Sequence, residues 1–220
     1  MTEGVLVDND VVVKICAYRC GREFLEIASI SDRAPSILAV ARHSISSRLG
    51  RSKTFADQRG AKTEWEELVS RLTIIEPSAE EVDLAADFET RAIELSLQLD
   101  TGESQLFAIL VSRSAPLLLT GDKRAIQALE EIAPSSSYGT VGCLEQLLLA
   151  FLTIFDSPTI RSRICAEPSA DRTATICFSC SSPSVPAATI VAGLKSYIAN
   201  LRAVTPRLLV AADDISAIVP

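Results

Sequence analysis

The stretch VLVDNDV at residues 5–11 decides the fold prediction, because a short apolar run ends there in two carboxylates. A second run, LLLTGD at residues 117–122, ends in the same way. Short continuous apolar runs are typical of strands buried on both faces of a parallel sheet. In an open α/β sheet the ligand crevice lies outside the carboxyl ends of the strands, so Asp8, Asp10 and Asp122 are expected to meet at one edge. Gathered carboxylates repel one another, and they usually hold a divalent cation or have raised pKa values.

Composition favours a globular protein of ordinary size. The chain has 220 residues, of which 48% are hydrophobic. Its pattern leads us to expect neither a signal peptide nor a membrane span. We therefore expect a soluble cytoplasmic protein. The six cysteines are too few for a disulfide scaffold and predict buried thiols in a reducing compartment. A net charge of −7 argues against general attraction to nucleic acid or to membranes.

Strand and helix patterns alternate along the first two thirds of the chain, which predicts an α/β fold of three α/β/α layers around a parallel sheet. We assign residues 1–150 to this domain and residues 151–220 to a mostly helical extension packed on it. The predicted strands cover residues 4–9, 73–75, 117–120 and 140–143. The predicted helices cover residues 11–30, 35–49, 77–99, 100–114, 123–132 and 187–204, while 50–63 is predicted to be loop and 161–186 shows little periodicity.

The stretch DTGESQL at residues 100–106 adds a third acid to the expected edge. Asp100 followed by Glu103 has the spacing of a capping box at a helix start. Glu103 also lies one turn into a helix that leads directly to the Leu117 strand. Its carboxylate is therefore expected to point to the same sheet edge as Asp8 and Asp122.

With these three acids in this order, the chain resembles the PIN-domain family of metal-dependent nucleases. The resemblance is carried by VDN at 7–9, GESQ at 102–105 and LTGDKRA at 119–125, and it covers roughly residues 4–150. It implies that Asp8, Glu103 and Asp122 are catalytic and bind one or two Mg²⁺ or Mn²⁺ ions that activate water against RNA. It also implies the toxin of a toxin–antitoxin pair, or a related RNA-processing enzyme. An antitoxin and a second copy of the chain are the protein partners considered.

The chain departs from the PIN pattern on its second predicted helix, where the family usually carries another acid and this sequence reads ILAVARH at 37–43. Asp10 is a candidate metal ligand that could restore the missing charge. Two alternatives stay open. One is a catalytically silent PIN-like module that binds RNA or protein. The other is a phosphatase resembling the haloacid dehalogenases, with Asp8 as nucleophile and Asp10 as general acid.

Basic residues cluster between positions 42 and 62 of this acidic chain. They are Arg42, Arg48, Arg51, Lys53, Arg59 and Lys62. Such a cluster predicts an edge that follows the phosphates of RNA, and its alternative is a solvated loop or a face for an acidic partner. Lys123, directly after Asp122, is a further candidate for a phosphate contact. A solvated residue in a helix first turn is the equally weighted alternative.

Overall fold

A central sheet of five parallel strands organises the computed structural model, which describes residues 4–51 and 55–215. The strand order is β3 (Thr73–Ile75), β2 (Ser36–Leu38), β1 (Leu6–Val7), β4 (Leu118–Thr120) and β5 (Val141–Cys143). β1 lies in the middle, where Leu6 pairs with Ser36 on one side and Leu118 on the other. The two apolar runs that end in acids are therefore adjacent parallel strands, as predicted.

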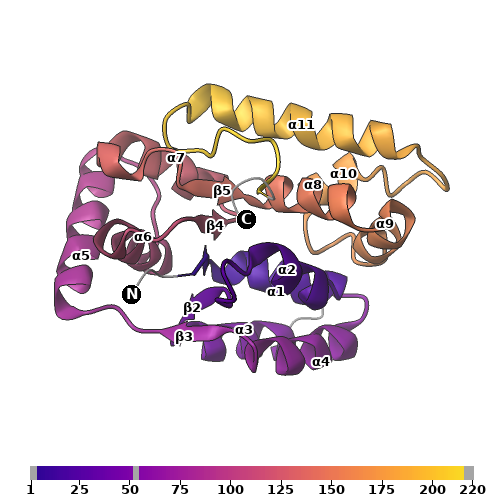
Figure 1. Cartoon of the computed structure of the whole chain (residues 1–220), viewed down its shortest axis with the longest axis horizontal. Coiled ribbons are helices and arrows are strands. Elements are labelled where there is room, and N and C mark those ends of the chain that lie inside the picture. Colours follow the sequence, from indigo (N-terminus) through magenta and orange to yellow (C-terminus); the bar gives the residue numbers. More distant parts are fainter. Residues whose placement is uncertain (1–3, 52–54, 216–220) are drawn as a thin grey trace.

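Helices cover both faces of the sheet (Figure 1). On one side lie α5 (Ala79–Glu94), α6 (Thr101–Arg113) and α7 (Lys123–Ile132). On the other side α1 (Asn9–Tyr18) and α2 (Gly21–Ala28) lie with α3 (Ala41–Arg51), α4 (Gln58–Val69) and α8 (Leu144–Ile154). β1, β2, β4 and β5 are buried because they are covered in this way, and apolar strands without alternation are the expected result. In the edge strand β3, Thr73 and Ile74 are exposed. The predicted α/β class with a parallel sheet is confirmed.

Two helix predictions in the N-terminal part were wrong. The segment 35–49 is not one helix, because Ser36–Leu38 forms β2 between β1 and β3, and α3 begins only at Ala41. The segment 11–30 is two helices, because Arg19 adopts a left-handed conformation (φ 53°) that ends α1. A three-residue strand is too short to show a period of two, so only its pairing within the sheet reveals it.

Two further boundaries differ from the prediction. Part of the predicted 50–63 loop is helical, since α4 starts at Gln58 and Asp57 caps it by accepting a hydrogen bond from the Gly60 N–H. α5 ends at Glu94 instead of Leu99, and Ser96 follows in the left-handed region (φ 57°). The start of α5 is as predicted, with a capping box between Ser78 and Glu81.

The C-terminal segment adds α9 (Ser157–Ala166), α10 (Arg172–Cys177) and α11 (Ala187–Val204). α11 matches its prediction, and it packs on α8, which itself runs through the predicted boundary at residue 150. The chain then returns to the sheet edge, where Leu209 bridges Val141. The buried Glu130 stabilises the segment after α11 by accepting hydrogen bonds from the Arg207 guanidinium and the Leu208 N–H.

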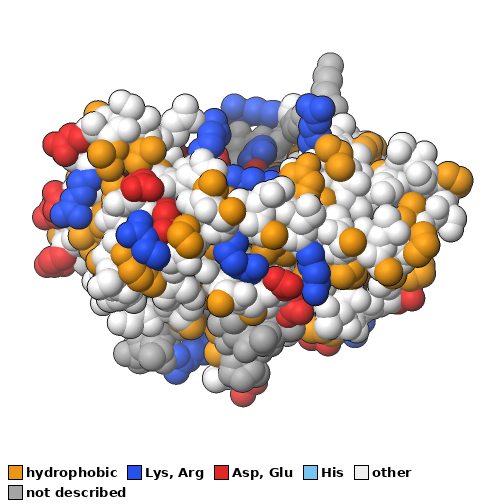
Figure 2. Space-filling view, turned by 90° about the horizontal axis from the view of Figure 1, so that it is seen from above, with side chains coloured by type: hydrophobic (Ala, Val, Ile, Leu, Met, Phe, Trp, Pro, Cys, Tyr) orange, Lys and Arg blue, Asp and Glu red, His pale blue; other side chains and the backbone are white. Residues whose placement is uncertain are grey.

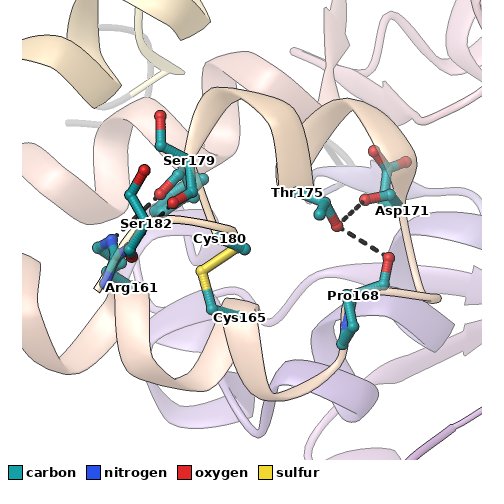
Figure 3. The surroundings of a disulfide bond; sticks show 9 residues. Arg161, Cys165, Pro168, Asp171, Thr175, Ser179, Cys180 and Ser182 are labelled. Carbon is teal, nitrogen blue, oxygen red and sulfur yellow. Dashed lines mark hydrogen bonds between the residues drawn. A yellow bond between two sulfur atoms is a disulfide. The ribbon is translucent and has the colours of Figure 1, made fainter. Parts of the chain in front are cut away.

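The expectation that every cysteine is a buried thiol was wrong for one pair. Cys165, near the end of α9, and Cys180, beyond α10, form a disulfide with a Cα–Cα distance of 5.1 Å (Figure 3). The Arg161 guanidinium brings the two ends together, because it donates to the carbonyl oxygens of Phe178, Ser179 and Ser182. The remaining cysteines, Cys16, Cys20, Cys143 and Cys177, are buried free thiols.

Membrane insertion was not expected. Within residues 4–51 and 55–215, no helix combines the length and the apolar character that crossing a bilayer requires.

Candidate metal centre

A cleft of about 900 Å³ opens at the carboxyl ends of β1 and β4. Its lining includes all four predicted carboxylates, which come from three places in the chain: Asp8 and Asp10, Glu103, and Asp122. Each of the three places is the start of a helix, namely α1, α6 and α7. The positive ends of three helix dipoles therefore face the cleft, and they partly offset the repulsion between the carboxylates.

Asp8 is a buried acid of the cleft, as is Glu103. It follows β1, caps α1 by accepting from the Asp10 N–H, and is only 8% exposed. The Thr120 hydroxyl lies 3.5 Å from its Oδ2. Burial, with a further contribution from the Asp10 charge, raises the pKa of Asp8 to about 6. Its carboxylate therefore carries a charge that the surrounding protein does little to stabilise.

Glu103 combines the two roles that its sequence context predicts. It forms the capping box of α6, in which the Asp100 side chain accepts from the Glu103 N–H and Glu103 Oε2 accepts from the Asp100 N–H. Burial raises the pKa of Glu103 to about 8, and the charges of Asp100, Asp8 and Asp122 add to this effect. Glu103 thus lines the same cleft as the acids that follow β1 and β4.

Asp122 differs from the other two acids because a cation accompanies it. It caps α7 by accepting from the Arg124 N–H at 2.8 Å, and the Arg124 guanidinium donates to its Oδ2 at 2.8 Å. The Arg124 side chain, through these bonds, lowers the pKa of Asp122 despite partial burial. The Arg124 side chain is 70% exposed, and its guanidinium also donates to Gln98 Oε1 at 2.9 Å.

Asp10, predicted as a metal ligand, has its carboxylate bound by two basic side chains. Lys14 Nζ lies 2.5 Å from its Oδ2, and Arg48 Nη2 from α3 lies 3.2 Å from its Oδ1. Both of its oxygens are therefore engaged by protein cations. The structure brings Asp10 to the cleft, as expected, but shows it in ion pairs.

The donor chemistry of the cleft fits a hard divalent cation. Asp8, Glu103 and Asp122 supply carboxylate oxygens, the ligand type that Mg²⁺ and Mn²⁺ prefer. As the side chains stand, no group of three or more His, Cys, Asp or Glu residues in the described part of the chain is assembled as a metal site. Asp122 faces Arg124 and Glu103 faces the Asp100 N–H, so binding requires these side chains to turn toward Asp8.

The predicted nucleic-acid contacts fall into two groups. α3, which carries Arg42, Arg48 and Arg51, borders the cleft through Ser44 and Arg48, and the three arginines are exposed. Figure 2 shows Lys and Arg side chains gathered around a hollow at the upper edge of the view. Lys53 lies outside the described residues. Arg59 and Lys62 are exposed on α4, where Lys62 faces Glu66.

Lys123 does not face the cleft. Its ammonium contacts buried Glu145 at 2.5 Å and the Thr173 hydroxyl at 3.2 Å, and it lies over the ring of Tyr197. The alternative of a solvated side chain does not describe it either, because these partners join α7 to the C-terminal segment. A phosphate contact by Lys123 would require this network to break.

Sequence reasoning missed Lys14, which lines the cleft, and its ion-pair partner Asp171. Lys14 lines the cleft, and its ammonium pairs with both Asp10 and Asp171. The spacing of Asp10 and Lys14 on one helix, four residues apart, was a signal for an ion pair. Asp171 has no such signal, because only the packing of α10 brings it to α1.

Comparison of the chain with protein-family models, with curated proteins and with solved structures gives no significant match. The resemblance to PIN domains therefore stays a prediction from the three motifs.

Proposed function

We propose that this protein is a PIN-like, metal-dependent ribonuclease in which Asp8, Glu103 and Asp122 hold one Mg²⁺ or Mn²⁺ ion. The observation that carries the proposal is the convergence of these carboxyl groups on one cleft, with the pKa of Asp8 at about 6 and that of Glu103 at about 8. Burying acids that repel one another lowers stability, and such arrangements are commonly found where a cation or a proton transfer is needed.

The protein's own groups account for binding and orientation. The positive dipole ends of three helices lie at the cleft, which favours an anionic phosphodiester. On α3, Arg48 lines the cleft, and Arg48 and the exposed Arg51 offer phosphate contacts. A bound divalent ion would neutralise charge on the phosphate oxygens and lower the pKa of a water molecule.

A phosphatase of the haloacid-dehalogenase kind is less well supported. That chemistry needs Asp10 as a general acid, whereas its carboxylate is held by Lys14 and Arg48. It also gives no role to Glu103 at the cleft.

The silent binding module differs from the nuclease in metal affinity, because a silent module has no need to bind Mn²⁺ at Asp8 and Asp122.

The test is incubation of the purified protein with mixed RNAs, with and without Mn²⁺, beside an Asp122→Asn variant. We expect Mn²⁺-dependent cleavage by the wild type and none by Asp122→Asn. Asn caps helices as well as Asp, so unfolding free energy should change by less than about 1 kcal/mol. Asp156→Asn, at the cap of α9, is the matched control and should cleave normally. Equal Mn²⁺-induced stabilisation of wild type and Asp122→Asn would show that Asp122 is not a ligand.

The basic residues give a second, independent prediction. Changing Arg48, Arg51 and Lys53 together to Gln should weaken binding to unrelated RNAs alike and flatten the dependence of log affinity on log salt. Each lost phosphate contact should reduce that slope by close to one, about 0.7 for single strands. The readout is fluorescence anisotropy at several salt concentrations, with Arg71→Gln as the exposed control. An unchanged slope would assign this stretch to solvent or to a protein partner.

A further inference from the structure

Lys14 is a buried cation inside the candidate centre. Its side chain is 9% exposed, and Nζ lies 2.5 Å from Asp10 Oδ2 and 2.7 Å from Asp171 Oδ2. Burial by itself would lower the pKa of Lys14, but the two carboxylates outweigh it and raise that pKa. An ammonium has three donors, and these ion pairs use two of them. Lys14 also lines the cleft.

The backbone next to Asp122 is shaped around this ion pair. A Cβ at Gly121 would lie 2.5 Å from Asp10 Oδ2 and 3.2 Å from Lys14 Nζ, so a larger residue here would displace the Asp10 carboxylate from its present position. Gly121 separates Thr120, which contacts Asp8, from Asp122. The ammonium of Lys14 therefore lies beside the proposed metal ligands.

The protein itself supplies positive charge at the cleft, through Lys14 and Arg48. The resemblance to PIN domains implies another acid on the helix after the second strand, but α3 instead supplies Arg48, which reaches Asp10. Asp10 is thus neutralised by Lys14 and Arg48. Asp10 and Asp171, the two carboxylates that pair with Lys14, are in this arrangement not available to bind a second divalent ion.

We propose that Lys14 is the fixed cation of a one-metal centre, an ammonium that contacts the substrate's phosphate where a second metal ion would otherwise be, and that Asp171 positions it. The inference rests on the proposed nuclease function. Lys14 remains protonated throughout and transfers no proton. Its contribution is a permanent positive charge at a developing negative oxygen, which is favourable in a buried site because no solvent has to reorganise.

Asp171 reaches Lys14 from the C-terminal segment. It caps α10 by accepting from the Ala174 N–H, and its backbone carbonyl accepts from the Thr175 hydroxyl (Figure 3). It lies within the loop that the Cys165–Cys180 disulfide closes. Thr173 of the same helix accepts from Lys123, the residue after Asp122. α10 therefore contacts α1 through the Asp171–Lys14 ion pair and α7 through the hydrogen bond from Lys123 to Thr173. Through Asp171, the C-terminal segment contributes a carboxylate that contacts Lys14.

The test is a count of bound Mn²⁺ per chain by electron paramagnetic resonance, which needs no activity. We expect one ion in the wild type and a second, weaker one in Lys14→Met, because that variant releases the carboxylates of Asp10 and Asp171. The double variant Lys14→Met/Asp171→Asn should return to one. Lys195→Met, which removes an exposed lysine, is the matched control and should stay at one.

Each outcome decides between the two proposals. A wild type that binds no Mn²⁺ overturns the nuclease function itself. Two ions in the wild type, or one in Lys14→Met, leave that function standing and overturn the role of Lys14. If Lys14→Met unfolds without metal, it is refolded in Mn²⁺. Recovery with two ions supports the proposal, and failure to recover counts against it.

Asp171→Asn tests positioning separately from structure. Asn keeps the α10 cap but removes the charge that holds Lys14. We expect kcat for RNA cleavage to fall roughly tenfold while KM stays within about twofold, as for loss of a residue that orients a functional group. Asp156→Asn, again the control for a helix cap, should change neither. A fall in kcat/KM through KM alone would reduce Asp171 to a structural residue.

Discussion

Asp8→Asn is expected to abolish Mn²⁺-dependent RNA cleavage and, at the same time, to stabilise the metal-free protein. Loss of a ligand forfeits the several kcal/mol of charge stabilisation that a metal ion supplies, so the rate should fall roughly a thousandfold or more. Stability should rise because the pKa of Asp8 is about 6 instead of 3.8, so keeping this group ionised at neutral pH costs about 2–3 kcal/mol. Asn is neutral and still caps α1.

Two measurements check this prediction. Single-turnover cleavage with and without Mn²⁺ gives the rate, and thermal melts in EDTA should show the melting temperature of Asp8→Asn about 4–10 °C above that of the wild type. Asp87→Asn, on the exposed face of α5, is the control for loss of one charge. A variant that loses activity together with stability would mean that Asp8 supports the fold and not a metal.

The metal-free protein is expected to lose stability as the pH rises from about 5 to 8. The folded pKa values of Asp8 and Glu103, about 6 and about 8, lie above their ordinary values of 3.8 and 4.5. Between the unfolded and the folded pKa, the folded state binds more protons, so the unfolding free energy decreases with increasing pH. The loss should be about 3–5 kcal/mol in total, since the two groups are coupled and do not add fully.

Mn²⁺ should flatten this pH dependence, because the ion binds the ionised carboxylates and compensates for the lost protons. At 100 times its Kd, it should add about 2.7 kcal/mol. Urea unfolding between pH 5 and 8, with and without Mn²⁺, gives the readout. Below pH 4.5, groups with a lowered pKa, such as Glu81 and Asp122, act in the opposite sense. The double variant Asp8→Asn/Glu103→Gln keeps both caps and should be nearly independent of pH. An equal slope in the wild type and the double variant would contradict the prediction.

Local sequence determined those parts of the molecule whose signals lie within a few neighbouring residues. The apolar runs before Asp8 and Asp122 predicted the paired strands β1 and β4. The spacing of Asp100 and Glu103 predicted the capping box of α6. Strand ends in a parallel sheet share one edge, so these local signals were enough to bring Asp8, Glu103 and Asp122 to one cleft.

Only the tertiary structure decided the features that depend on partners distant in the chain. Ser36–Leu38 is a strand because β1 and β3 pair with it on either side, although its own sequence also suits a helix. Cys165 joins Cys180 because α9 and α10 bring them together.

The ion pair of Lys14 with Asp171 also depends on residues that are distant in the chain. A salt bridge between distant residues leaves no periodic trace in the sequence, since its energy depends on distance and burial in space. The state of Asp10 follows from this. The sequence predicted that its carboxylate lies at the carboxyl edge of the sheet. The cations that pair with it are Lys14 of the same helix and Arg48, which the packing of α3 brings to it.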